Sequence, residues 1–166
     1  MTSALRASKA GLGYEVEKKM EANYDREEQA GTPQAIVNWT NAILNGKHEP
    51  CPGSGIKDIG AYFKSGVPLC KLINELLASE GKPPIPYQKK VMSPFVALTN
   101  LENFAKGCEN YGLSKECTVQ STDVHECRKA GLYNFINTMH SLGFLANSKG
   151  YMPAYTGEIV KYLDNE

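Results

Sequence analysis

The chain has 166 residues, of which 42% are hydrophobic and 22% are charged, and its 18 basic residues balance 18 acidic ones. This length favours one domain with a single core, which buries roughly 70% of the surface that the unfolded chain exposes. A net charge of zero excludes a global electrostatic field that would attract nucleic acid or lipid, so an acidic partner must be met by a local basic patch. We therefore expect no nucleic acid and no membrane among the partners.

Two segments bear on where the protein resides. Residues 1–19 have no apolar core between a basic start and a small-residue cleavage site, so they do not resemble a secretory signal. Residues 130–148 are uncharged and long enough to span a bilayer, but they carry polar side chains where a membrane helix has apolar ones. These polar residues are Asn134, Asn137, His140 and Ser141. We expect a cytoplasmic protein in which this segment is a packed helix.

The cysteines are odd in number, and no two of them have C-x-x-C spacing, which favours reduced thiols. They are Cys51, Cys70, Cys108, Cys117 and Cys127. Cys70 and Cys108 fall on apolar helix faces and are expected in the core. Cys117, His125 and Cys127 lack a fourth ligand and paired spacing, so we expect no zinc site and no cofactor.

The first predicted helix is charged and covers residues 14–28. Its apolar stripe is thin, with Val16, Met20 and Tyr24, so it can dock on a domain but cannot form one. The sequence AGTP at 30–33 then breaks the pattern. We assign residues 1–30 to an N-terminal leader, 31–148 to the domain and 149–166 to a C-terminal tail.

The first core helix is predicted over residues 33–44. Thr32 is its expected cap, and Pro33 suits the first turn, where its missing N–H removes no intrahelical bond. One face of the helix carries Ile36, Trp39 and Ile43. The turn-forming residues of NGKHEPCPGSG, 45–55, predict a surface loop.

Two further helices share a start signal, a capping serine followed by a proline in the first turn. Ser65 and Pro68 open the first, and Gly81 ends it. The proline-rich sequence KPPIP at 82–86 then predicts an extended segment. Ser93 and Pro94 open the second, which ends before residue 112. The apolar faces are Leu69, Leu72, Ile73, Leu76 and Leu77 in the first helix and Leu98, Leu101, Phe104, Ala105 and Cys108 in the second.

Residues 122–129 predict a short helical turn, with Asp123 as its cap and Glu126 three residues later. The last long helix is predicted over 129–145. Its apolar side carries Leu132, Phe135, Ile136, Met139 and Leu142. Four long helices with almost no strand pattern predict an all-α fold.

No pattern in the sequence predicts catalysis. His48 lies in the polar loop, His125 in the short turn and His140 in a helix, so their spacing supports no Ser-His-Asp or Cys-His arrangement. The segments GLG at 11–13 and GSG at 53–55 lack the strand, the helix start and the lysine of a phosphate-binding loop. We expect a binding protein and not an enzyme.

Five segments occur in a characteristic order. They are Trp39 in the first core helix, FKSGVPLCKLINEL at 63–76, NLENFAKGCENYGL at 100–113, QSTDVHE at 120–126 and FINTMHSLGFLA at 135–146. This order resembles the calponin-homology domain, and GLGYEVEKKMEANYD at 11–25 resembles the charged leader of the transgelin and calponin branch. The resemblance implies four main helices, short connecting helices and the helix at 130–146 in the centre, with Trp39 buried near it.

The resemblance also implies a partner, the actin cytoskeleton, where single domains of this family are weak or auxiliary filament binders and adaptors for signalling proteins. Strong binding usually requires two domains in tandem or the Gly-rich repeats that often follow the domain in this branch. We expect a monomer that binds F-actin weakly.

Actin filaments are acidic, so the candidate contacts are lysines away from the apolar faces. They are Lys64, Lys71, Lys89, Lys90 and Lys106. QKKVMSP at 88–94 is the strongest candidate because two adjacent charges precede Val91 and Met92, which are expected to be exposed. Two alternatives remain open: binding to microtubules, which are also acidic, and a signalling scaffold with no filament contact.

Overall fold

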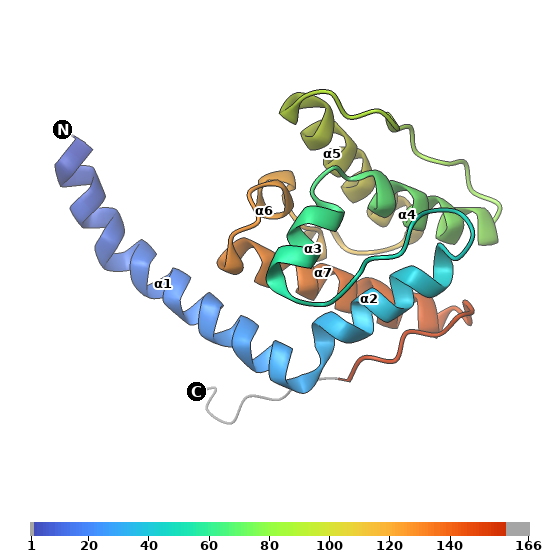
Figure 1. Ribbon diagram of the computed structural model, residues 1–166, viewed down its shortest axis with the longest axis horizontal. Coiled ribbons are helices and arrows are strands. Elements are labelled where there is room, and N and C mark those ends of the chain that lie inside the picture. The colour runs from blue at the N-terminus through green and yellow to red at the C-terminus, as the bar shows by residue number, and fades with distance from the viewer. Residues whose placement is uncertain (1, 159–166) are drawn as a thin grey trace.

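The computed structural model describes residues 2–158, with side chains from residue 13 onwards. Within residues 2–158 it contains seven α-helices, one short 3-10 helix and no strand (Figure 1). The all-α fold predicted from the sequence is therefore confirmed. The elements are α1 (Thr2–Ala30), α2 (Thr32–Ile43), α3 (Ile56–Phe63), α4 (Val67–Ser79), α5 (Pro94–Tyr111), η1 (Lys115–Cys117), α6 (Ser121–His125) and α7 (Lys129–Ser148).

The core lies between α2, α4, α5 and α7. α4 packs along α5, while α7 packs against α1, α2 and α6. Trp39 is only 2% exposed, and the apolar side of α7 is buried as expected. In the part of the chain that the structure describes, no helix is both long and apolar enough to cross a membrane.

The expected apolar face of α5 is wrong at two positions. Leu98 and Ala105 are half-buried, whereas Leu101, Phe104 and Cys108 are buried. The reason is angular, because at about 100° per residue Leu98 and Ala105 lie at one edge of the stripe that faces α4 and α6.

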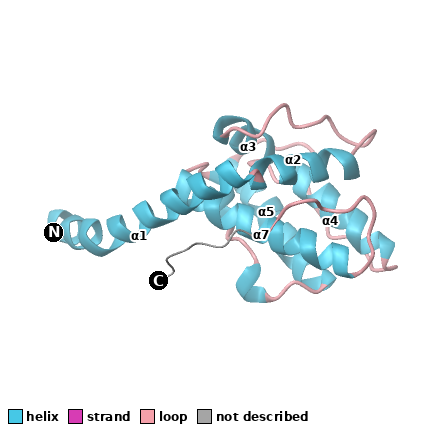
Figure 2. Ribbon diagram, turned by 90° about the horizontal axis from the view of Figure 1, so that it is seen from below, coloured by secondary structure: helices cyan, strands magenta, loops and turns pink. Residues whose placement is uncertain are grey.

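α1 is longer than the predicted helix, since it begins at Thr2 and not at residue 14. It extends beyond the helical bundle (Figures 1 and 2). Within residues 13–30 the C-terminal part docks, with Tyr24 buried, whereas Val16 remains 58% exposed. Two ion pairs hold α1 to the start of α7: Glu17 with Arg128 at 2.7 Å and Asp25 with Lys129 at 3.0 Å.

Of the four proposed caps, Ser93 is confirmed, Thr32 and Asp123 are corrected, and Ser65 accepts from a backbone N–H as predicted but lies one residue before the N-cap position. Ser93 Oγ accepts from the Val96 N–H at 3.3 Å, as predicted. Thr32 is instead the first residue of α2, after Gly31 in the left-handed region, and its hydroxyl donates to Glu27 at 2.6 Å. Asp123 lies inside α6, which follows Gln120.

The proposed cap of α4 is also one residue out of place. Gly66, with φ 79°, occupies the N-cap position, and Ser65 Oγ accepts from the Val67 N–H at 3.2 Å. Glycine is required here twice over, because φ is positive and a Cβ would lie 2.7 Å from Asn100 Cβ. The chain therefore passes very close to α5 at this point.

Sequence reasoning missed α3. This eight-residue helix buries Ile59 and Phe63 on one side. It lies between the loop at 45–55 and α4, and it contacts α4 and α6.

Asparagine side chains hold the extended segments to the helices. In the described part of the chain, four asparagines each use the side-chain amide to bind both the N–H and the C=O of one non-helical residue, at 2.8–3.2 Å. The pairs are Asn41 with Cys51, Asn74 with Ile85, Asn100 with Gln88 and Asn147 with Tyr155. Because both backbone groups are satisfied, these segments lie on the domain without forming a sheet.

The segment after α7 runs back along α2 (Figure 1). Trp39 Nε1 donates to the Pro153 carbonyl at 2.9 Å, and the Trp39 and Tyr155 rings meet edge to face at 5.5 Å. Gly143 makes room for the buried Tyr155 ring, since a Cβ there would lie 2.4 Å from it. Residues 151–157 are therefore part of the packed domain.

Candidate interaction surface

The best candidate for a functional surface lies between α4 and α5. The linker at 80–93 runs in an open arc along the edge of the molecule to the start of α5 (Figure 1). Lys89 and Lys90 are exposed on it. Of the two apolar residues expected to be exposed, Val91 is half-buried, whereas Met92 is 78% exposed, and Phe95 in the first turn of α5 is 75% exposed. We call Lys64, Lys89, Lys90, Met92 and Phe95 the linker surface.

The first half of the linker is fixed by its prolines and by one side chain directed inward. Pro83, Pro84 and Pro86 favour extended backbone, both at their own positions and at the residues before them. Ile85 is buried, and its Cγ1 lies 3.3 Å from where a Cβ on Gly107 would be. Asn74 binds the backbone of Ile85 on both sides, with N–H···O at 2.8 Å and the amide donating to the carbonyl at 3.2 Å.

The second half is fixed by Asn100, a buried residue of α5. Its Oδ1 accepts from the Gln88 N–H at 2.9 Å, and its Nδ2 donates to the carbonyls of Gln88 at 3.0 Å and Ser65 at 3.1 Å. One amide group thus holds the linker against the turn between α3 and α4. Because Lys64 and Lys89 adjoin these two carbonyls, the clamp brings their backbones close together.

The structure does not bring the other two predicted lysines into this surface. Lys71 is half-buried, and its ammonium donates to the Lys47 carbonyl at 3.0 Å. Lys106 is exposed and lies on nearly the same face of α5 as Phe95, but about three turns further on, roughly 16 Å away. Exposed Glu102 lies on that face between them.

Sequence reasoning missed Phe95. Its side chain lies in the first turn of α5, just after the capping Ser93 and before the stripe that packs on the core begins. A signal for it was present, because a large aromatic side chain directly after a Ser-Pro start sits at the end of the helix, where few neighbours are available to cover it.

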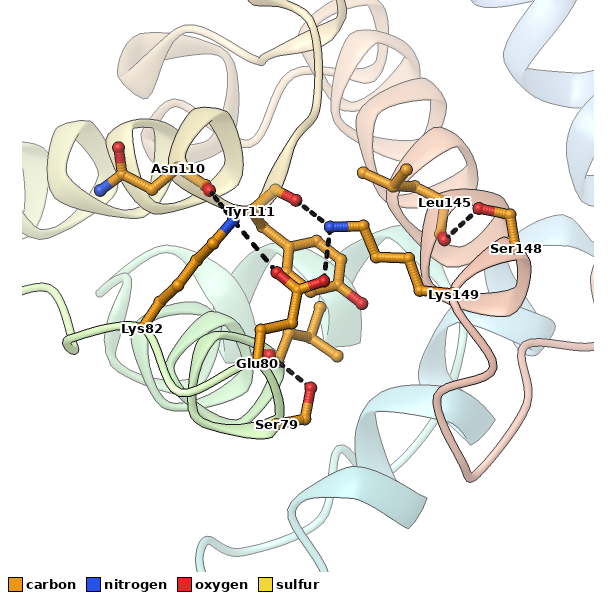
Figure 3. Close-up of polar contacts among 9 residues, drawn as sticks. Ser79, Glu80, Lys82, Asn110, Tyr111, Leu145, Ser148 and Lys149 are labelled. Atoms are coloured by element: carbon orange, nitrogen blue, oxygen red, sulfur yellow. Dashed lines mark hydrogen bonds and ion pairs between the residues drawn. The ribbon is translucent and has the colours of Figure 1, made fainter.

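A cluster of charges anchors the beginning of the linker (Figure 3). Glu80 pairs with Lys149 at 2.8 Å and with Lys82 at 3.1 Å, and these two contacts lower the pKa of its carboxyl. Lys149 also donates to the Tyr111 carbonyl and lies 3.9 Å from the centre of the Tyr111 ring. Lys82 donates to the Asn110 carbonyl at 2.9 Å, so both ammonium groups are engaged within the domain.

A surface cleft of about 380 Å³ lies beside η1, α6 and α7. Its lining is mostly polar, and Asp123 accepts there from Asn134 at 3.3 Å. Burial raises the pKa of the Asp123 carboxyl. Within the described residues, the cleft combines no nucleophile with a histidine base, and no three His, Cys, Asp or Glu side chains are placed to hold a metal ion.

The cysteines differ in environment. Cys70 and Cys108 are buried in the core as predicted. Burial raises the pKa of the Cys70 thiol to about 12 and that of Cys108 well above its usual value. Cys51 is buried as well, whereas Cys117 is exposed and Cys127 is half-buried.

We expect these environments to set the order of thiol reactivity. A chromogenic disulfide reagent near neutral pH should modify Cys117 first and leave Cys70 and Cys108 unreacted, because their thiolates are both shielded and disfavoured. Five thiols should react after unfolding without reductant. Fewer than five would reveal a disulfide, and rapid loss of Cys70 or Cys108 would contradict their placement in the core.

Comparison with known proteins bears on these observations. The family model of the calponin homology (CH) domain matches residues 31–145. Rac guanine nucleotide exchange factor B of Dictyostelium discoideum is 30% identical over 128 residues, which are 77% of this chain. The chain spans only 10% of the length of that protein.

Proposed function

Because the chain belongs to the calponin homology domain family, we propose that it is a cytoplasmic, non-enzymatic protein that binds actin filaments weakly through the linker surface. The observation that supports this most is the pair of asparagine clamps, which fix the linker just before Lys89 and Lys90, while Met92 and Phe95 are exposed where the linker leads into α5. We further propose that it belongs to the transgelin and calponin branch, with α1 as the charged leader.

The composition of the linker surface suits an acidic filament. Lys89, Lys90 and Lys64 attract the partner over a distance of about one Debye length, roughly 8 Å at physiological ionic strength. Met92 and Phe95 then offer apolar area that an interface buries at its centre. Since each exposed ion pair contributes little, we expect a dissociation constant in the micromolar range or weaker.

A signalling adaptor is the second candidate function. It is favoured by the relative in Dictyostelium discoideum, whose name describes a guanine nucleotide exchange factor, and in which the similar region is a small part of a long chain. In this case the linker surface would bind a signalling protein and no filament. Microtubules, which are also acidic, are a third partner that charge alone does not separate from actin.

Co-sedimentation with actin filaments and, in parallel, with microtubules tests the proposal. We expect the protein to pellet with actin at low ionic strength and to be released as salt rises. The double variant Lys89→Glu and Lys90→Glu should no longer pellet, while its melting temperature stays nearly unchanged because both side chains are exposed.

The matched control is Lys19→Glu with Lys115→Glu, which makes the same change in net charge at exposed lysines on α1 and η1. It should pellet almost like the parent. Equal losses in both double variants would mean that only net charge matters, and the linker surface would be rejected. A parent that never pellets with actin would favour the adaptor, and pelleting with microtubules alone would favour the third partner.

A further inference from the structure

We propose that residues 83–89 are also a ligand for an SH3-type domain, one that recognises a polyproline II helix in a groove lined by aromatic rings and flanked by acidic side chains. This inference goes beyond the proposed function and does not depend on it. The segment reads PPIPYQK, in which Pro83, Pro86 and Lys89 are spaced at intervals of three residues.

The backbone of this segment favours a polyproline II helix. Three prolines fix their own φ near −65°, and each excludes the helical region for the residue before it, which restricts Lys82, Pro83 and Ile85. The structure shows neither helix nor turn over residues 82–88. A polyproline II helix has about three residues per turn, so side chains three apart lie along one ridge.

The domain covers only part of this helix. Ile85 is buried between α4 and α5, while Pro83, Pro84 and Pro86 are all exposed. With a repeat of three residues, Pro83 and Pro86 lie on one exposed ridge of the helix, and Pro84 lies on the adjacent ridge. Grooves that bind proline-rich peptides contact two adjacent ridges. Here the ridge of Pro83 and Pro86 is exposed, and the adjacent ridge carries exposed Pro84 and half-buried Tyr87, so the prolines of both ridges face away from the core.

The clamps of Asn74 and Asn100 make the segment a preorganised ligand. They bind the backbone of Ile85 and Gln88, on either side of Pro86. A flexible proline-rich peptide must lose conformational entropy when it docks, whereas this segment is already ordered. None of the three prolines packs in the core, so beyond stiffening the linker their rings are available to a partner.

Charge sets the direction of docking. Lys82, at one end of the prolines, is engaged by Glu80 and by the Asn110 carbonyl. Lys89 and Lys90, at the other end, are exposed. An acidic rim would therefore pair with the C-terminal end of the segment. Because Lys89 also belongs to the linker surface, the SH3-type partner and the actin filament would compete.

The test uses the whole chain, labelled with nitrogen-15, and a panel of purified SH3 domains with acidic groove rims. We expect at least one domain to cause saturable chemical-shift changes at the amides of Ile85, Tyr87, Gln88 and Lys89, because the prolines themselves have no N–H. The variant Pro83→Ala with Pro86→Ala should bind about tenfold or more weakly. The control variant Pro50→Ala with Pro52→Ala, which changes two exposed prolines in the loop before α3, should bind like the parent.

The inference is overturned if no domain in the panel shifts these amides, or if the Pro83 and Pro86 variant, shown to be folded by its spectrum, binds as tightly as the parent. Shifts at these amides in a protein that does not pellet with actin would reject the filament proposal and leave this one standing. If the protein does pellet, a saturating concentration of the SH3 domain should release it from actin. Release of the Pro83→Ala and Pro86→Ala variant should need a higher concentration of the domain, because the variant binds the domain more weakly.

Discussion

Trp39→Ala is expected to lower the free energy of unfolding by about 3–5 kcal/mol, a large part of the stability of a domain of this size. The indole is almost fully buried, so its removal leaves a cavity that α2 and α7 cannot close by small shifts. It also removes the donor to the Pro153 carbonyl and one of the rings that pack against Tyr155. The loss should therefore extend to the segment at 151–157.

Urea unfolding followed by circular dichroism measures this loss, since the variant has no tryptophan fluorescence. Trp39→Phe is the informative control, because it keeps a ring in the core but removes the N–H to Pro153, and it should lose less stability. Hydrogen exchange at the Tyr155 amide, which donates to Asn147 at 2.8 Å, should accelerate in both variants. A parent whose fluorescence is that of a solvated indole would contradict the packing of α2.

The sequence predicted the main helices because burial imposes a helical repeat on their apolar residues. α2, α4 and α7 show this repeat over three or more turns, and their buried faces agree with it. α3 is only eight residues long, so Ile59 and Phe63 gave too short a pattern to separate it from a loop. The cap positions were displaced because glycine at positive φ, at residues 31 and 66, begins two helices without a side-chain cap.

The candidate surface was predictable only in part. Two adjacent lysines before Met92 marked the linker, but which other lysines join them depends on tertiary contacts. Lys71 does not join the linker surface, because its ammonium binds the Lys47 carbonyl in the loop after α2. Lys64 lies close to the linker because the Asn100 clamp also binds the carbonyl of the neighbouring Ser65. Asn100 itself left a signal, because an asparagine next to Leu101 on the core side of a helix must find partners for its amide.

Asn100→Ala is expected to lower the free energy of unfolding by about 1–3 kcal/mol and to weaken filament binding without any change in charge. The variant leaves the Gln88 N–H and the carbonyls of Gln88 and Ser65 without the amide that now binds all three. The linker then loses its attachment to α5, and Lys89 and Lys90 are no longer held beside Lys64. Faster hydrogen exchange at Gln88 and Lys89 measures this release independently of any partner.

Asn41→Ala is the control that separates the position of the lysines from the stability of the domain. Asn41 makes the same two-sided clamp on Cys51, with bonds of 2.8 and 3.2 Å, in the loop between α2 and α3 and away from the linker. We expect it to cost a similar free energy of unfolding but to pellet with actin like the parent when both variants are compared at temperatures well below melting. If Asn100→Ala pellets as well as Asn41→Ala despite faster exchange at Gln88, the lysines act without being held in place, and the filament needs their charge but not their arrangement.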